Sequence, residues 1–111
     1  MAKAMVVRVW KTGLDTARAG EYENFARVRS LPMFQRHNGF CGVLFAAAGA
    51  DRVVITLWRD RAAAAALERS DDYRATVAAL EATGFLRPPQ TVELLDVHDS
   101  YGGLGASGFD H

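Results

Sequence analysis

The fold of this chain is decided by the stretch Val53-Val54-Ile55-Thr56-Leu57-Trp58. Five of its six residues are β-branched or aliphatic, and the run closes on a tryptophan. Alternate side chains of a strand point to opposite faces, and here both sets are largely apolar. A strand with one face in water would alternate apolar with polar residues, so we predict a central strand covered on both faces.

The composition of the whole chain excludes several classes of protein. The 111 residues predict one domain, and the 13 basic and 13 acidic residues balance, so no overall field favours nucleic acid or anionic lipid. No apolar run approaches the ~20 residues of a membrane span, and no signal-peptide pattern precedes the first expected strand. The single cysteine, Cys41, excludes an intramolecular disulfide and is typical of a reducing compartment. We therefore expect a cytoplasmic protein.

A strand of similar composition is predicted near the start of the chain, from Met5 to Trp10. On this strand Arg8 shares a face with Val6 and Trp10, whereas Met5, Val7 and Val9 share the other. An arginine among apolar residues is either held by an ion pair at the rim of the sheet or turned toward a ligand. The sequence leaves both possibilities open.

A helix is predicted after a turn over residues 13–16, with Asp15 or Thr16 as its N-cap. Its buried face is marked by the helical spacing of Tyr22, Phe25, Ala26 and Arg29. Pro32 breaks or restarts this helix, and Asn38-Gly39 ends the continuation. His37, close to that end, is expected either at the surface or as a partner of the helix dipole.

The second half of the chain repeats this order. Phe40 to Ala47 predicts a strand, and residues 48–51 a hairpin turn into Val53–Trp58. Asp60 and Ser70 are expected to cap two helices, the first of them rich in alanine. Asp71-Asp72 falls in the first turn of the second helix, where carboxylates favour the helix dipole, so we interpret the pair as capping rather than catalytic.

The end of the chain predicts one more strand and a tail. Pro88-Pro89 is interpreted as a rigid connector, and Thr91 to Val97 as the last strand. Residues 99–111 contain four glycines and are expected to form a flexible tail. The folded domain is thus expected to cover residues 1–98.

The predicted order is β-α-β-β-α-β, which indicates an α+β, ferredoxin-like fold with a four-stranded antiparallel sheet. The helices of such a fold cover only one face of the sheet. Because the first and third strands are apolar on both faces, we expect a second copy of the chain to cover the other face in a homodimer.

The same residues support a family resemblance. The chain resembles the antibiotic biosynthesis monooxygenase superfamily of dimeric α+β barrels over roughly Met5 to Val97. The likeness rests on five stretches taken in order: Val7-Arg8-Val9-Trp10, Gly20-Glu21-Tyr22-Glu23, Asn38-Gly39-Phe40-Cys41-Gly42, Thr56-Leu57-Trp58-Arg59-Asp60 and Ser70-Asp71-Asp72-Tyr73.

The resemblance implies a monooxygenase that needs no cofactor and acts on a small phenolic, polyketide-like or quinol-like substrate. A deprotonated phenol is electron-rich enough to reduce dioxygen directly, so the protein has only to bind the ring, stabilise its oxyanion and exclude water. The catalytic residues that it implies are Arg8, Trp58 and Tyr73. The expected substrate-binding residues are Trp10, Tyr22, Phe25 and His37. No metal site is expected, because no set of metal-binding side chains has diagnostic spacing.

Three alternatives stay open. The haem-degrading branch of the superfamily uses an asparagine on the first strand and a histidine ligand in a helix after Trp58. This chain has Arg8 in place of the first and no histidine between Ser70 and Leu80, so His37 or His98 would have to bind the haem iron. A second alternative is a dimer that binds a small aromatic ligand without catalysis. A third is a purely structural dimer in which Trp58 is only a core residue.

Overall fold

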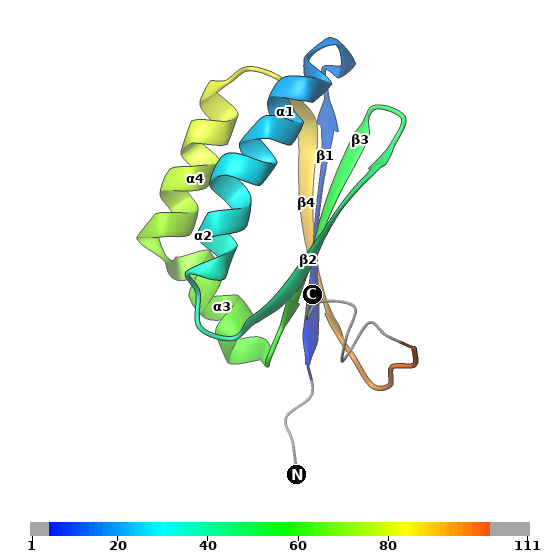
Figure 1. Cartoon of the computed structure of the whole chain (residues 1–111), viewed down its shortest axis with the longest axis vertical. Coiled ribbons are helices and arrows are strands. Elements are labelled where there is room, and N and C mark those ends of the chain that lie inside the picture. Colours follow the sequence, from blue (N-terminus) through cyan, green and yellow to red (C-terminus); the bar gives the residue numbers. More distant parts are fainter. Residues whose placement is uncertain (1–4, 103–111) are drawn as a thin grey trace.

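A computed structural model describes residues 5–102 of the chain. Four strands form one antiparallel sheet in the order β2-β3-β1-β4, and all helices lie on the same side of it (Figure 1). The strands are β1 (Val6–Leu14), β2 (Phe40–Ala48), β3 (Asp51–Trp58) and β4 (Leu86–Asp96). This arrangement confirms the predicted α+β, ferredoxin-like fold.

The stretch from Val53 to Trp58 lies in β3, between β2 and β1, as predicted for a central strand. Val54, Thr56 and Trp58 are buried beneath the helices, and alternate residues such as Ile55 are half-buried on the opposite face. Figure 1 shows no helix over that opposite face. Within residues 5–102, the helices therefore cover one face of this central strand, and the other expected covering is not present in the described part of the chain.

The connection between β1 and β2 is a continuous helical segment of changing pitch. It runs through η1 (Thr16–Arg18), α1 (Ala19–Phe25), the π-helical η2 (Ala26–Ser30) and α2 (Leu31–Gln35). Asp15 caps its start by accepting a hydrogen bond from the Ala17 backbone N–H. Pro32 lies in the first turn of α2, where its missing N–H is tolerated, so the proline restarts the helix after a wider π turn.

The two helices after β3 begin at the predicted caps. The Asp60 carboxylate accepts from the Ala63 N–H at the start of α3 (Arg61–Arg69), and the Ser70 hydroxyl accepts from the Tyr73 N–H at the start of α4 (Asp71–Ala82). The small side chains of α3 allow a close approach: a Cβ at Gly39 would lie 2.5 Å from the Cβ of Ala63. Gly39 has a φ of +89°, which also favours glycine there.

The largest differences from the predicted element boundaries are in β1 and β4. β1 continues past Trp10 to Leu14, so Gly13 lies within the strand opposite Arg87 and not in a turn. β4 begins at Leu86 and includes Pro88-Pro89, which we had interpreted as a connector. Two features explain this: β4 is an edge strand, and its register with β1 shifts between Arg87 and Thr91, so Pro88 and Pro89 lie in a bulge that does not need their backbone donors.

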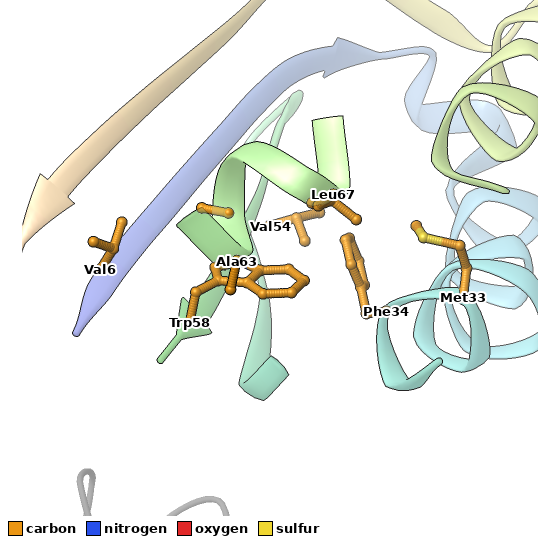
Figure 2. Close-up of a cluster of buried hydrophobic side chains, with 8 residues drawn as sticks. Val6, Met33, Phe34, Val54, Trp58, Ala63 and Leu67 are labelled. Atoms are coloured by element: carbon orange, nitrogen blue, oxygen red, sulfur yellow. The ribbon is translucent and has the colours of Figure 1, made fainter. Parts of the chain in front are cut away.

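The core lies between the helices and the sheet in two adjoining clusters. The larger one surrounds Trp58 with Val6, Phe34 and Leu67, and Figure 2 shows Phe34 between Trp58 and Met33. The smaller one joins Leu14, Tyr22, Leu80 and Phe85 at the other end of the helical layer. The expected flexible tail, residues 99–111, falls mostly outside the described residues, which end at Gly102.

Candidate functional site

Trp58, expected to contact a substrate, lies instead at the centre of the larger core cluster. It has no exposed surface, and its ring meets Phe40 and Phe34 edge-on at 5.6 and 6.5 Å between centroids. The indole N–H donates to the Thr56 hydroxyl over 2.8 Å, so the polar atom of the ring is satisfied within the core. Trp58 does not line either of the two spaces described below.

The first of these spaces is a cavity of about 40 Å³ between the sheet and the helices. Its lining brings together four predicted site residues: Arg8, Trp10, Tyr22 and Tyr73. Arg8 and Trp10 come from the helix-facing side of β1, Tyr22 from α1 and Tyr73 from α4. The alternation of β1 and the helical spacing around Tyr22 therefore place these side chains together, although they are far apart in sequence.

Among the described residues, Arg8 is the only charged side chain that lines this cavity, and it is 3% exposed. Its Nε donates to a Glu68 carboxylate oxygen over 2.9 Å, and one terminal nitrogen donates to the Tyr73 hydroxyl over 2.7 Å. The guanidinium carbon also lies 5.1 Å from the centre of the Tyr73 ring. The ion pair left open for Arg8 is thus present, and because Arg8 also lines the cavity, a role toward a ligand stays a prediction.

Sequence reasoning did not single out Glu68. A weak signal exists, since Glu68 follows Ala64 by one helical turn and Ala64 is fully buried against the sheet. The Glu68 side chain is 41% exposed, so the ion pair with Arg8 extends from the cavity wall to solvent. Within residues 5–102, neither a carboxylate nor a histidine lines the cavity itself.

The second space is an open groove of about 410 Å³ between the helical segment after β1 and the far end of the β2–β3 hairpin. Tyr22 and Phe45 line both the groove and the cavity, so these two side chains lie between the spaces. Arg27 and Arg52 also line the groove. Arg52 was not singled out from the sequence, although it lies two residues before Val54, in phase with the buried face of β3.

Tyr22 is a hydrogen-bond donor rather than a base in this site. Burial raises its pKa to about 12, an effect that the nearby Arg52 charge opposes and Glu23 reinforces. The hydroxyl consequently keeps its proton at neutral pH. A base for proton abstraction is therefore absent from the described lining of the cavity.

The other two predicted binding residues lie away from both spaces. His37 Nδ1 is 2.8 Å from the Met33 carbonyl oxygen, and Nε2 is 2.9 Å from the Ser70 hydroxyl. A carbonyl only accepts, so Nδ1 carries the proton, and in the neutral ring the Ser70 hydroxyl donates to Nε2. His37 thus connects the end of α2 to the cap of α4. Phe25 stacks beneath Arg29 and packs against the smaller core cluster.

Within residues 5–102, no group of three or more His, Cys, Asp or Glu residues is arranged to hold a metal ion. Burial raises the pKa of the Cys41 thiol, which disfavours a nucleophilic role. In the same range, no helix has the length and apolar character to cross a membrane.

Comparison with known proteins gives structural matches only. No protein-family model and no curated protein sequence matches the chain. Solved structures with similar folds include the cofactor-independent oxygenase SnoaB from Streptomyces nogalater (TM-score 0.70, 20% identity, 87% of this chain and 96% of that chain). The ActVA-Orf6 monooxygenase of Streptomyces coelicolor, in complex with nanaomycin D, matches with a TM-score of 0.73 and 17% identity. The match covers 88% of this chain and 91% of that chain. A putative antibiotic biosynthesis monooxygenase from Caulobacter crescentus also has a TM-score of 0.73 and 17% identity. That match covers 87% of this chain and 92% of that chain.

The chain has the fold of the antibiotic biosynthesis monooxygenases. This confirms the resemblance drawn from the five sequence stretches at the level of the fold. Identities of 20% or less establish no shared reaction, because one fold hosts many functions. The site described above must therefore support any assignment of activity.

A haem site does not fit the residues that this monooxygenase fold places here. Among the described residues, neither the cavity of about 40 Å³ nor the groove of about 410 Å³ has a histidine in its lining. Both ring nitrogens of His37 are engaged by Met33 and Ser70, and His98 is an exposed residue beyond the end of β4. The third histidine, His111, lies outside the described residues.

Proposed function

We propose that this protein is a cofactor-independent monooxygenase that oxidises a small phenolic aromatic with dioxygen. The observation that carries the proposal is the part-buried hydrogen bond of 2.7 Å from an Arg8 terminal nitrogen to the Tyr73 hydroxyl, on the wall of a cavity that Trp10 and Tyr22 also line. These residues supply a cation, two hydroxyl donors and aromatic surface, which suit binding of an electron-rich phenolate.

In the proposed reaction, Arg8 stabilises the phenolate oxygen of the substrate. Its hydrogen bonds to Glu68 and Tyr73 use Nε and one terminal nitrogen, so among the described residues the other terminal nitrogen stays available as a donor. For an anthrone, the ionised ring transfers electrons to dioxygen. One oxygen atom becomes the new quinone carbonyl, and the other leaves as water with the two hydrogens lost from the ring carbon.

No free base lines the cavity among the described residues, and this determines how the substrate loses its proton. Glu68 is engaged by Arg8, and Tyr22 keeps its proton. Glu23 lines the groove but not the cavity that contains Arg8, so the phenol proton passes to water beside Arg8, whose charge favours the ionised phenol. We expect the rate to rise with pH along the ionisation of the substrate, so that a more acidic phenol reaches its maximum rate at lower pH.

The two spaces differ in the ligand size that they admit. Ligand pockets typically measure about 300–1,000 Å³, so a cavity of about 40 Å³ cannot hold a fused ring by itself. The adjoining groove of about 410 Å³ can. In our proposal the substrate occupies the groove and reaches Arg8 when Phe45, which is 41% exposed on the edge strand β2, rotates aside.

The proposal is tested by oxygen uptake across anthrones, naphthols and quinols, with a metal chelator present. Arg8→Ala should lower the rate by about a hundredfold, because removing one charge-assisted contact to a developing oxyanion costs roughly 2–4 kcal/mol. Arg61→Ala is the matched control, since Arg61 pairs with Asp96 on the surface. Circular dichroism should show that both variants remain folded. A wild-type protein that binds none of these compounds would contradict the proposal.

A second candidate function is ligand binding without catalysis, and the base-free lining of the cavity favours it. This function predicts that aromatic compounds bind and raise the unfolding temperature while no oxygen is consumed. The two functions are therefore separated by the same set of compounds, measured once by thermal unfolding and once with an oxygen electrode.

A further inference from the structure

Arg52 carries a buried charge that its own surroundings leave partly unpaired. The residue is 8% exposed, and one terminal nitrogen donates to the backbone carbonyls of Gly49 and Asp51 at the hairpin turn. Its Nε–H is buried without a hydrogen-bond partner. Within residues 5–102, no ion pair reaches this side chain, unlike that of buried Arg8. Buried charges are normally paired, so Arg52 indicates a missing anionic partner.

The geometry of the unpaired atoms defines the partner. In Arg36 and Arg61, Nε and the second terminal nitrogen together hold an aspartate in a two-point contact. In Arg52 this same edge makes no hydrogen bond within residues 5–102, whereas the first terminal nitrogen is fixed to the turn. An arginine edge of this shape matches the two oxygens of a carboxylate.

Arg52 lies in the wall of the open groove of about 410 Å³, close to further donors. The Tyr22 hydroxyl makes no hydrogen bond within residues 5–102, and it keeps its proton because its pKa is raised to about 12. Arg27 adds a second positive charge, and Glu23 is the one acid among the described residues that line the groove. Phe45, Leu31 and the alanines of β2 supply an apolar wall beside these groups.

We propose that this groove binds the carboxylate of an aromatic acid, with Arg52 as its two-point anchor and the Tyr22 hydroxyl as an additional donor. The ring then lies against Phe45, on the side that leads to Arg8. Because Nε is shielded from water in this structure, binding requires a small movement of a groove side chain such as Phe45 or Arg27. The aromatic part of this ligand rests on the proposed function, and the carboxylate part rests on Arg52 alone.

The test uses 3-hydroxy-2-naphthoate and its methyl ester, titrated by calorimetry without oxygen so that no turnover contributes. The pair differs only in the anionic group. We expect the acid to bind the wild-type protein about tenfold to a hundredfold more tightly than the ester, because hydrogen bonds to charged groups contribute in that range. In Arg52→Gln this preference should fall to within about twofold. Arg36→Gln, a surface arginine with its own aspartate, should keep it.

Every outcome of this test decides something. Equal affinity for acid and ester in the wild-type protein would overturn the carboxylate site while leaving the aromatic site standing. An acid preference that survives in a folded Arg52→Gln protein would show that another cation is the anchor. Failure of both compounds to bind at millimolar concentration would overturn both proposals. If Arg52→Gln does not fold, Arg52→Lys keeps the charge, removes the two-point edge and should lower the preference by about tenfold. Acid-selective binding without oxygen uptake on any phenol would leave the anion site intact and refute the oxygenase.

Discussion

At the scale of single residues, two side chains on neighbouring strands have separate roles. Trp58 is enclosed by aromatic and aliphatic neighbours and directs its N–H to Thr56, whereas Arg8 borders the internal cavity. The Thr56 hydroxyl in turn lies 3.4 Å from the Arg8 backbone carbonyl, to which it donates. Trp58 therefore supports the strand that carries Arg8, and we expect it to affect a ligand only indirectly.

This placement gives a prediction for Trp58→Phe. The smaller ring removes a buried hydrogen bond and leaves a gap in the larger core cluster, which should lower the free energy of unfolding by about 1–3 kcal/mol. Ligand affinity of the folded variant should stay within about twofold of wild type. Trp10→Phe is the matched comparison, because Trp10 lines the cavity and its loss should weaken binding more than stability. Urea unfolding and ligand titration on both variants separate the two effects. A Trp58→Phe protein of normal stability that no longer binds ligand would contradict this assignment.

Tyr22 gives a prediction about alkaline pH. Its pKa is raised to about 12 in the folded state by burial, against about 10 in an unfolded chain. The unfolded state therefore loses this proton first, so the stabilising contribution is complete below about pH 10 and is lost as the pH rises toward about 12. Urea unfolding at pH 9, 10 and 11 should show a smaller decline for Tyr22→Phe than for wild type. Equal declines in the two proteins would show that Tyr22 is as accessible as an ordinary tyrosine.

At the scale of elements, the N-terminal ends of the helices position the side chains of the site more than the helix interiors do. Ser70 accepts from the Tyr73 N–H and also contacts the His37 ring, so a single hydroxyl fixes the start of α4 against the end of α2. The first turn of α4 carries Tyr73, whose hydroxyl reaches Arg8 on β1. The cap of one helix thereby determines where the cavity wall lies.

We therefore expect Ser70→Ala to cost about 1–2 kcal/mol of unfolding free energy, from loss of the cap and of the His37 contact. Ser100→Ala, at an exposed position after β4, is the control and should change stability by less than about 0.5 kcal/mol. Chemical unfolding followed by circular dichroism measures both. Equal stability of the two variants would show that other contacts hold the start of α4.

The elements also show which features a sequence can predict. The central position of β3 and the caps at Asp60 and Ser70 depend on local patterns, and all were predicted; for Pro32 the sequence left a break or a restart open, and the structure shows the restart. The inclusion of Pro88-Pro89 in β4 was not, because the tolerance of a strand for proline depends on its place at the sheet edge.

The residues of the candidate site also fall into two groups, those that a local pattern predicts and those that it does not. The alternation of β1 was sufficient to place Arg8 and Trp10 on one face, and both line the cavity. Glu68 reaches Arg8 across 60 positions of sequence, and Arg52 is identified only by the partner that it lacks. Contacts between residues distant in sequence are set by tertiary packing, so no local sequence pattern predicts them.

At the scale of the whole molecule, the face of the sheet opposite the helices is the main unexplained surface. Ile55 of β3 lies on it between Val9 of β1 and Leu44 of β2. Leu44 and Leu95, on either edge strand, are each 46% exposed. Contiguous apolar surface of this kind usually marks an interface. A second copy of the chain is the partner that we predict, because sheet-on-sheet packing would complete the covering of β1 and β3.

The homodimer is tested with a charge at the centre of this face. Light scattering during gel filtration should report twice the chain mass for the wild-type protein at micromolar concentration. Ile55→Lys should shift it to the monomer mass, because a buried interface would have to desolvate the ammonium group without a partner. Val92→Lys is the control: Val92 is apolar and 47% exposed, but its register opposite Trp10 puts it on the helix side of the sheet, where a lysine meets solvent and leaves the dimer intact. A folded wild-type monomer, or an Ile55→Lys dimer, would remove the argument for sheet-on-sheet pairing, and the apolar face would then require a different partner.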